Sequence, residues 1–137
     1  MARIVQKFGG TSVADTDRIR AVAEKVKREI NAGNEVAVLL SAMAGVTNQL
    51  VAYVDDVSTL YDAREYDTVV STGEQVTVGL LALVLQGMGI PARSWLGWQV
   101  PIRTDNVHSK ARIEDIESVE LDKRMKAGEV PVVAGFQ

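Results

Sequence analysis

The stretch VQKFGGTSV, Val5–Val13, decides how the beginning of the chain folds. A strand-like apolar segment runs into Lys7, a Gly-Gly pair and two hydroxyl residues. Adjacent glycines expose successive N–H groups that suit a phosphate, and a lysine supplies positive charge. The stretch matches neither a P-loop nor a GxGxxG turn. It is therefore either a different kind of phosphate-binding turn, backed by the start of the next helix, or an ordinary strand-to-helix turn beside a solvated lysine.

The segments that follow alternate between helix and strand patterns. Helices are predicted from Ala14 to about Asn34, after Thr47, over Gly73–Met88, and over VELDKRMKAGE as far as Gly128. Buried strands are predicted at Ile4–Phe8, at Val36–Leu40 and in the final VPVVAGFQ. This alternation favours an α/β fold with a mainly parallel sheet and right-handed crossovers.

The first helix has the clearest pattern. One face is apolar and the other carries Arg, Lys and Glu, and the apolar face consists of Ile19, Val22, Ala23, Val26 and Ile30. Asp15 or Asp17 can cap its start, and Gly33 can end it.

Other segments are less regular. In the second predicted helix, Leu50, Val51, Val54 and Val57 share one side, and Ser58–Arg64 reads as a polar connection. Gly73–Met88 is too long for a typical strand and is rich in Leu, Ala and Gln, which favours a buried helix. The segment IPARSWLGWQVPI indicates an edge strand or a hairpin, and VHSKARIEDIES is too polar to assign.

Composition excludes several classes of function. The 137 residues are 47% hydrophobic and 24% charged, as expected for one soluble globular domain. The absence of cysteine excludes disulfides, zinc–thiolate sites and thiol nucleophiles, and a single histidine excludes a multi-histidine metal site. A net charge of −3 gives no support to a nucleic-acid partner. The most apolar run, Val76–Leu85, is too short to cross a bilayer, so we expect a cytoplasmic protein.

Three loops carry candidate chemistry, and each also has a purely structural interpretation. KFGGTS is the turn described above, and SAMAGVT places Ser41 and Thr47 after the second strand, where Thr47 could simply cap a helix. STGEQ places Glu74 before the apolar helix, where it either pairs with a ligand cation or forms a capping box. All three loops are predicted to face one crevice at the carboxyl edge of the sheet.

Three remaining features complete the sequence-based expectations. Trp95 and Trp98 of SWLGWQ suit the packing of a sheet edge or a subunit contact, and we expect His108 in a solvated loop. The chain stops at Gly135-Phe136-Gln137, where a strand delivers its carboxyl end. Ligands bind at that edge in open parallel sheets, so we expect a fragment of a larger domain.

The combination of KFGGTS, SAMAGVTN, STGEQ and the terminal VAGFQ, in this order, resembles the amino-terminal part of an aspartokinase of the amino-acid kinase fold. The resemblance extends over the whole chain. It implies a three-layer αβα sandwich on a mainly parallel sheet, with residues 1–137 forming an incomplete kinase domain and no second domain. It also implies transfer of the γ-phosphoryl group of Mg-ATP to the β-carboxylate of L-aspartate, the first step toward lysine, threonine and methionine.

The resemblance also implies roles for individual residues. Lys7, Phe8, Gly9, Gly10 and Ser41 match the ATP phosphate site, with Lys7 as the catalytic residue. Thr47 and Glu74 match aspartate-binding positions, and Mg²⁺ arrives with ATP without assigned protein ligands. The carboxylate nucleophile is ionised at neutral pH, so the reaction requires alignment and cationic stabilisation but no general base.

The resemblance further implies a longer enzyme, expected to be a homo-oligomer with no nucleic-acid or membrane partner. The missing part would hold the adenine pocket and further aspartate ligands, so we expect the 137 residues alone to be inactive. Two alternatives stay open. One is a kinase of the same fold that acts on glutamate or N-acetylglutamate, and the other is a non-catalytic module that binds an anion or a partner chain.

Overall fold

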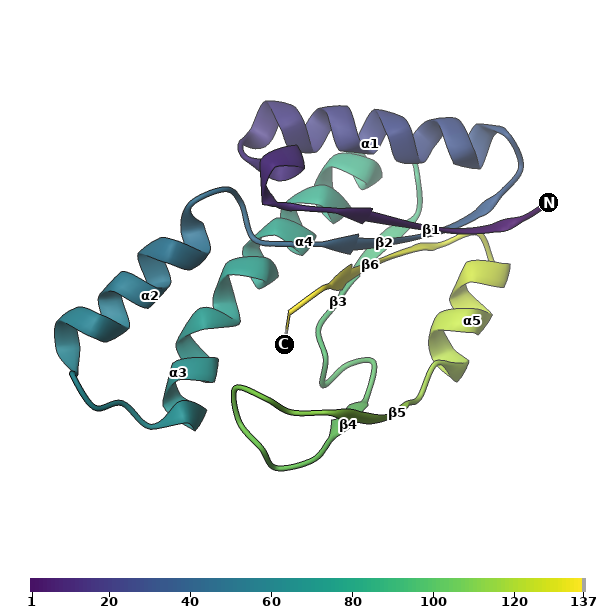
Figure 1. Cartoon of the computed structure of the whole chain (residues 1–137). Helices are drawn as coiled ribbons and strands as arrows, with labels where there is room; N and C mark the ends of the chain where they lie inside the picture. The colour runs from purple at the N-terminus through teal and green to yellow at the C-terminus, as the bar shows by residue number, and fades with distance from the viewer. Residues whose placement is uncertain (137) are drawn as a thin grey trace.

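Residues 1–136, which the computed structural model describes, form a four-stranded parallel sheet and a separate two-stranded hairpin (Figure 1). The strand order is β1-β2-β6-β3, and the strands are β1 (Arg3–Phe8), β2 (Glu35–Leu40), β6 (Val130–Ala134) and β3 (Ala92–Trp95). The hairpin pairs β4 (Ile102–Thr104) with β5 (Ile113–Ile116) in antiparallel orientation. The predicted α/β class with a mainly parallel sheet is confirmed.

Helices lie on both faces of the sheet and beyond one of its edges (Figure 1). The helices α1 (Thr16–Asn31) and α4 (Thr72–Gly87) pack on one face and on each other, and α5 (Val119–Lys126) contacts β6 and β2 from the other face. The helices α2 (Val46–Val57) and α3 (Ala63–Val70) lie beyond the carboxyl ends of the strands. The expected three layers are therefore present.

The hydrophobic core lies between the sheet and the α1–α4 pair. The predicted apolar stripe of α1 is buried at Ile19, Val22, Ala23 and Val26 and half-buried at Ile30. Asp15 caps α1 by accepting a 2.8 Å hydrogen bond from the Arg18 N–H. Gly33 ends the helix with a φ of 83°, a conformation that glycine adopts without steric cost.

The most apolar helix is α4, and its composition reflects its place in the core. Together α3 and α4 span Ala63–Gly87, a 25-residue stretch that is long and apolar enough to cross a membrane by composition alone. However, Val78, Leu81 and Leu85 are fully buried in the core cluster with α1 and the sheet. This burial accounts for the apolar character of α4, and it confirms the predicted buried helix.

Two of the less regular segments differ from the expectation. Val54 is buried, but Val57, in the last turn of α2, is 81% exposed and does not share the buried side. The polar segment left unassigned contributes β5, whose four residues are all exposed. Without a buried face, this strand lacks the apolar alternation by which a strand is recognised in sequence. The edge strand expected in IPARSWLGWQVPI is β3.

The register of the sheet determines which loops meet. Phe8 is the partner of Leu40, and Leu40 is in turn the partner of Ala134. Three parallel strands therefore end level with one another, and the loops that follow them emerge side by side at the carboxyl edge (Figure 1). This is the edge at which ligands bind in open parallel sheets.

Candidate functional site

The candidate site begins with hydrogen bonds that join the ends of the three strands. The Ser41 N–H donates to the Phe8 carbonyl at 3.1 Å, and the Gly135 N–H donates to the Leu40 carbonyl at 2.9 Å. These bonds extend the sheet pairing one residue past each strand. The glycine pair, the 41–47 loop and Gly135 are thereby held in a fixed order along the edge.

A cavity of about 380 Å³ opens where these loops meet α3 and α4. Four of the predicted site residues line it, namely Gly10, Ser41, Thr47 and Glu74. The remaining lining residues are Ala42, Met43, Ala44, Gly45, Tyr66, Val70 and Phe136. Three segments far apart in sequence thus contribute to one hollow, as the sequence predicted.

Gly10 approaches the 41–47 loop very closely. A Cβ placed on Gly10 would lie 3.0 Å from the carbonyl oxygen of Ala42, whereas a Cβ on Gly9 would meet nothing within 4 Å. A Cβ on Gly73, at the start of α4, would lie 3.0 Å from the Cβ of Ala42. Glycine at positions 10 and 73 therefore lets the turn and α4 close on Ala42 from two directions.

This asymmetry predicts different outcomes for two neighbouring substitutions. Gly10→Ala should destabilise the protein by about 1–3 kcal/mol, because the added methyl group meets backbone atoms that must shift. Gly9→Ala, the matched control, should change stability by less than about 1 kcal/mol, because Gly9 has a φ of −79° and open space around it. Urea unfolding of both variants measures the difference, and equal losses would contradict the close approach at Gly10.

Three of the predicted ATP-site residues, Lys7, Phe8 and Gly9, lie outside the cavity lining. Lys7 is exposed at the end of β1, and its positive charge is the smallest of the effects that partly oppose the rise in the Glu74 pKa caused by burial. The half-buried Phe8 ring packs against the core and lies 5.8 Å from the Lys25 Nζ. Phe8 can therefore take part in phosphate binding through its backbone but not through its ring.

The helix start expected beside the glycine pair is not that of a long helix. Gly9 precedes a one-turn 3-10 helix, η1 (Gly10–Val13), and α1 begins only at Thr16. The first turn of α1 is occupied by the Asp15 cap. The expectation that the start of the next long helix supports this turn is therefore wrong. The N–H groups of the turn itself remain as candidate phosphate donors.

Thr47 does not cap the helix that follows the second strand, so this structural interpretation is wrong. The residue before α2 is Gly45, with a φ of 81°, so Thr47 lies inside the first turn instead of capping it. Its side chain is free of the capping role and lines the cavity.

Glu74 does not form a capping box either. The hydroxyl of Ser71 donates to the Thr68 carbonyl and that of Thr72 donates to the Val69 carbonyl, so neither caps α4. The buried carboxylate of Glu74 instead accepts a short hydrogen bond from the Phe136 N–H, across 62 positions in sequence. Burial raises the pKa of Glu74, and the backbone N–H groups of Phe136, Ala42 and Gly135 and the charge of Lys7 partly oppose this effect.

Sequence reasoning missed several residues of the cavity wall. Tyr66 and Val70 come from α3, a helix that was not predicted and that begins at Ala63, inside the expected polar connection Ser58–Arg64. The Tyr66 ring stacks on Tyr61 with centroids 5.1 Å apart. Phe136 is part of the cavity wall because the chain after β6 runs beside Glu74. The small residues of SAMAGVT were the available signal for Ala42 and Gly45, since they leave room for a ligand.

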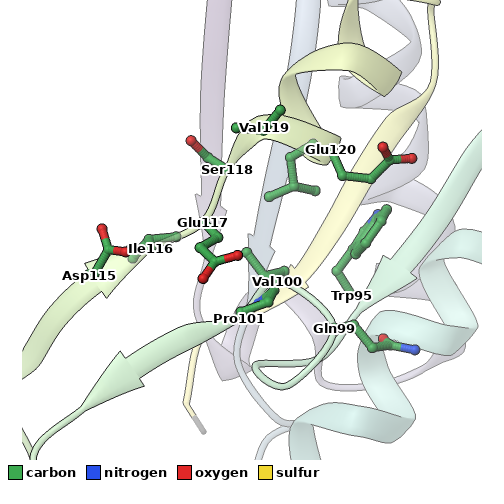
Figure 2. Close-up of a pocket in the computed structure, with 11 residues that line it drawn as sticks. Trp95, Gln99, Val100, Pro101, Asp115, Ile116, Glu117, Ser118, Val119 and Glu120 are labelled. Atoms are coloured by element: carbon green, nitrogen blue, oxygen red, sulfur yellow. The ribbon is translucent and has the colours of Figure 1, made fainter.

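A second cavity, of about 610 Å³, lies between the turn after β3 and the start of α5 (Figure 2). Trp95 and Val100 form part of its lining. Of its carboxylates, Glu117 pairs with Arg103, and Glu120 pairs with Arg124 at 2.8 Å. Glu117 and Glu120 thus already have partners, and the third carboxylate of the lining, Asp115, is exposed in β5. None of the predicted site loops reaches this cavity. The candidate chemistry therefore belongs to the cavity at the carboxyl edge.

The chain belongs to the amino acid kinase family, whose family model matches residues 2–137. It is 54% identical to an aspartokinase of Rickettsia felis and 52% identical to the aspartate kinase Ask_LysC of Stutzerimonas stutzeri, over its whole length in both cases. The chain spans only about a third of the length of these relatives, 35% and 33% respectively.

Solved structures agree with this family assignment. The aspartate kinase from Synechocystis superposes with a TM-score of 0.80 at 42% identity, covering 97% of this chain and 22% of that one. Aspartokinase III of E. coli, solved with aspartate and ADP, superposes with a TM-score of 0.80 at 23% identity, covering 97% of this chain and 40% of that one. The latter likeness shows the fold alone.

Proposed function

We propose that residues 1–137 form the amino-terminal part of the kinase domain of an aspartate kinase. The enzyme would transfer the γ-phosphoryl group of ATP to the β-carboxylate of L-aspartate. The observation that carries this proposal is the convergence of Gly10, Ser41, Thr47 and Glu74 on one cavity at the carboxyl edge of the sheet. The identity of more than 50% to aspartokinases favours aspartate over glutamate or N-acetylglutamate as the acceptor.

The chemistry follows from the groups that the site offers. An oxygen of the aspartate β-carboxylate attacks the γ-phosphorus while the bond to the ADP oxygen breaks, which gives an acyl phosphate and ADP. The nucleophile is already ionised at neutral pH, so no base is required. The charge of Lys7 and the N–H groups of Gly9 and Gly10 would stabilise the moving phosphoryl group, and Ser41 would contact the phosphates.

The acceptor side of the cavity would hold aspartate itself. Glu74 is the acidic side chain among the cavity-lining residues of the described part of the chain, and it would receive the α-ammonium group. Thr47 would donate a hydrogen bond to a substrate carboxylate. No group of three or more acidic or histidine side chains that could hold a metal occurs in residues 1–136, so we assign Mg²⁺ to the phosphates of ATP.

Two further properties of the enzyme are proposed with its function. We place the enzyme, whose proposed substrates are small and water-soluble, in the cytoplasm, and we propose that it is a homo-oligomer. Sedimentation of the purified enzyme measures the oligomeric state, and a monomer at micromolar concentration would contradict it.

The proposal predicts that the 137 residues alone do not catalyse phosphoryl transfer from ATP to aspartate. A full-length kinase can be made by exchanging residues 1–137 for the matching segment of the Pseudomonas aeruginosa aspartokinase, which is 52% identical to this chain. We refer to this protein as the full-length kinase. ADP release with ATP, Mg²⁺ and aspartate should reach the usual enzyme range of about 1–10³ s⁻¹ in the full-length kinase and remain at background in the isolated chain.

The acceptor is tested in the same assay with glutamate and N-acetylglutamate in place of aspartate. Preference for either would overturn the assignment of the acceptor. Turnover in the usual enzyme range by the isolated chain would show that the 137 residues are a complete kinase.

A further inference from the structure

The tip of the β4–β5 hairpin contacts α3 through one carboxylate, that of Asp67. Asp67 Oδ2 accepts a 3.0 Å hydrogen bond from the Ser109 N–H and lies 3.2 Å from His108 Nδ1. Asp67 Oδ1 lies 3.5 Å from the Ser109 hydroxyl oxygen. The Asp67 side chain is only 25% exposed, and its partners are 41 and 42 positions away in sequence. His108 thus occupies a partly exposed loop, as expected, but with a specific partner.

The backbone of the tip adopts a conformation that needs support. Ser109 has a φ of 62°, the left-handed region that side-chain-bearing residues rarely adopt. Such a conformation persists where surrounding contacts fix it. Both the N–H and the hydroxyl of Ser109 are directed to Asp67, so the carboxylate contacts the residue that carries the unfavourable backbone angle.

Packing leaves the hairpin incompletely supported elsewhere. A cavity of about 380 Å³ separates it from the sheet and is lined by Ile113 and Ile116 on one side and by Leu39 and Phe136 on the other. Within the part of the chain that the structure describes, the hairpin therefore does not close tightly on the sheet. The hydrogen bonds between Asp67 and the hairpin tip, which we call the tie, therefore have a larger influence on the position of the hairpin.

The tie is adjacent to the candidate site. Tyr66, next to Asp67 in α3, and Val70, one turn later, line the cavity that contains Thr47 and Glu74. Phe136 lines both this cavity and the one beneath the hairpin. A displacement of the hairpin would therefore reach two walls of the candidate site, one through α3 and one through Phe136.

We propose that Asp67 is a positioning residue that holds the hairpin tip on α3 and thereby fixes Tyr66 and Phe136 as walls of the acceptor cavity. The inference rests on the proposed function, because that function identifies the cavity as the binding site for the phosphoryl acceptor, aspartate. The contact between Asp67 and the tip is independent of that function. Asp67 itself lies outside the lining of the acceptor cavity and acts through its neighbours.

The test compares three variants of the full-length kinase. Asp67→Ala removes all three contacts, whereas Asp67→Asn keeps a carbonyl acceptor for the Ser109 N–H. Asp62→Ala is the control, because Asp62 caps α3 by accepting from the Arg64 and Glu65 N–H groups and makes no contact with the hairpin among those described. The readouts are hydrogen exchange of residues 105–112 and separate KM values for aspartate and ATP.

We expect exchange in the tip to accelerate by about tenfold or more in Asp67→Ala, to recover largely in Asp67→Asn, and to stay unchanged in Asp62→Ala. The KM for aspartate should rise by about tenfold in Asp67→Ala, with the KM for ATP within about twofold. Unchanged exchange would overturn the tie, and faster exchange with an unchanged aspartate KM would overturn the positioning role. If the unmodified full-length kinase has no activity, the proposed function fails, and the exchange data still decide the tie.

Discussion

Replacing Lys7 by alanine in the full-length kinase is expected to lower kcat by about 100-fold or more. The physical reason is the loss of one fixed positive charge from the place where negative charge moves during phosphoryl transfer. Lys7 stands at the carboxyl end of β1, next to the glycine turn, and its charge already acts on Glu74 across the site. Steady-state kinetics with ATP and aspartate varied separately measures the effect.

Two further variants make this expectation specific. Lys7→Arg keeps the charge but changes its shape, and it should recover only part of the rate. Lys123→Ala removes an exposed lysine of α5 and serves as the control for a general change of charge. A rise in the KM for ATP with kcat unaltered would show that Lys7 only binds the nucleotide.

The substitution Glu74→Gln should lower kcat/KM for aspartate by an amount equivalent to about 2–5 kcal/mol, with little effect on the KM for ATP. Glutamine keeps the size of the side chain and can still accept from the Phe136 N–H, but it cannot pair with an ammonium group in a buried site. Glu24→Gln on the exposed side of α1 is the matched control. An unchanged aspartate KM and kcat would leave Glu74 with the structural role of holding Phe136.

The same variant has a signature in the pH dependence of stability. Because the folded-state pKa of Glu74 is raised above 4.5, mainly by burial, the folded protein binds this proton more tightly than the unfolded chain does. The contribution of Glu74 to stability is therefore greatest below pH 4.5 and declines as pH rises through the raised pKa. The unfolding free energy of the parent protein should fall relative to that of Glu74→Gln over this range, and a rise would contradict a raised pKa.

The parts of the fold that could be predicted from sequence are those with strong local patterns. The first helix has a full apolar stripe, a capping aspartate and a terminating glycine, so burial and local chemistry agree. The strands β2 and β6 are apolar on both faces because helices and loops cover both sides of the sheet. Parallel strands also place their loops at one edge, which is why the convergence of Gly10, Ser41 and Thr47 could be predicted.

The parts that could not be predicted depend on contacts between distant residues. Glu74 occupies a position that suits a capping box, and the competing partner, the Phe136 N–H, is 62 residues away. The hairpin was missed because β5 is exposed along its whole length and its tip is held by Asp67 from another part of the chain. The fact that Gly10 is crowded while Gly9 is not depends on a carbonyl of the 41–47 loop, which local sequence does not reveal.

The position of β6 has a consequence for how the chain folds as it leaves the ribosome. Among the strands of the described residues, β6 comes last in sequence, and it occupies the sheet between β2 and β3. Until residue 130 emerges, β2 has an unpaired side and β3 has no neighbour within the sheet, so nascent chains carry open strand edges that favour aggregation. Assembly is delayed until β6 inserts, and we expect slow, chaperone-sensitive maturation, which pulse-labelled refolding with chains ending before and after residue 134 would reveal.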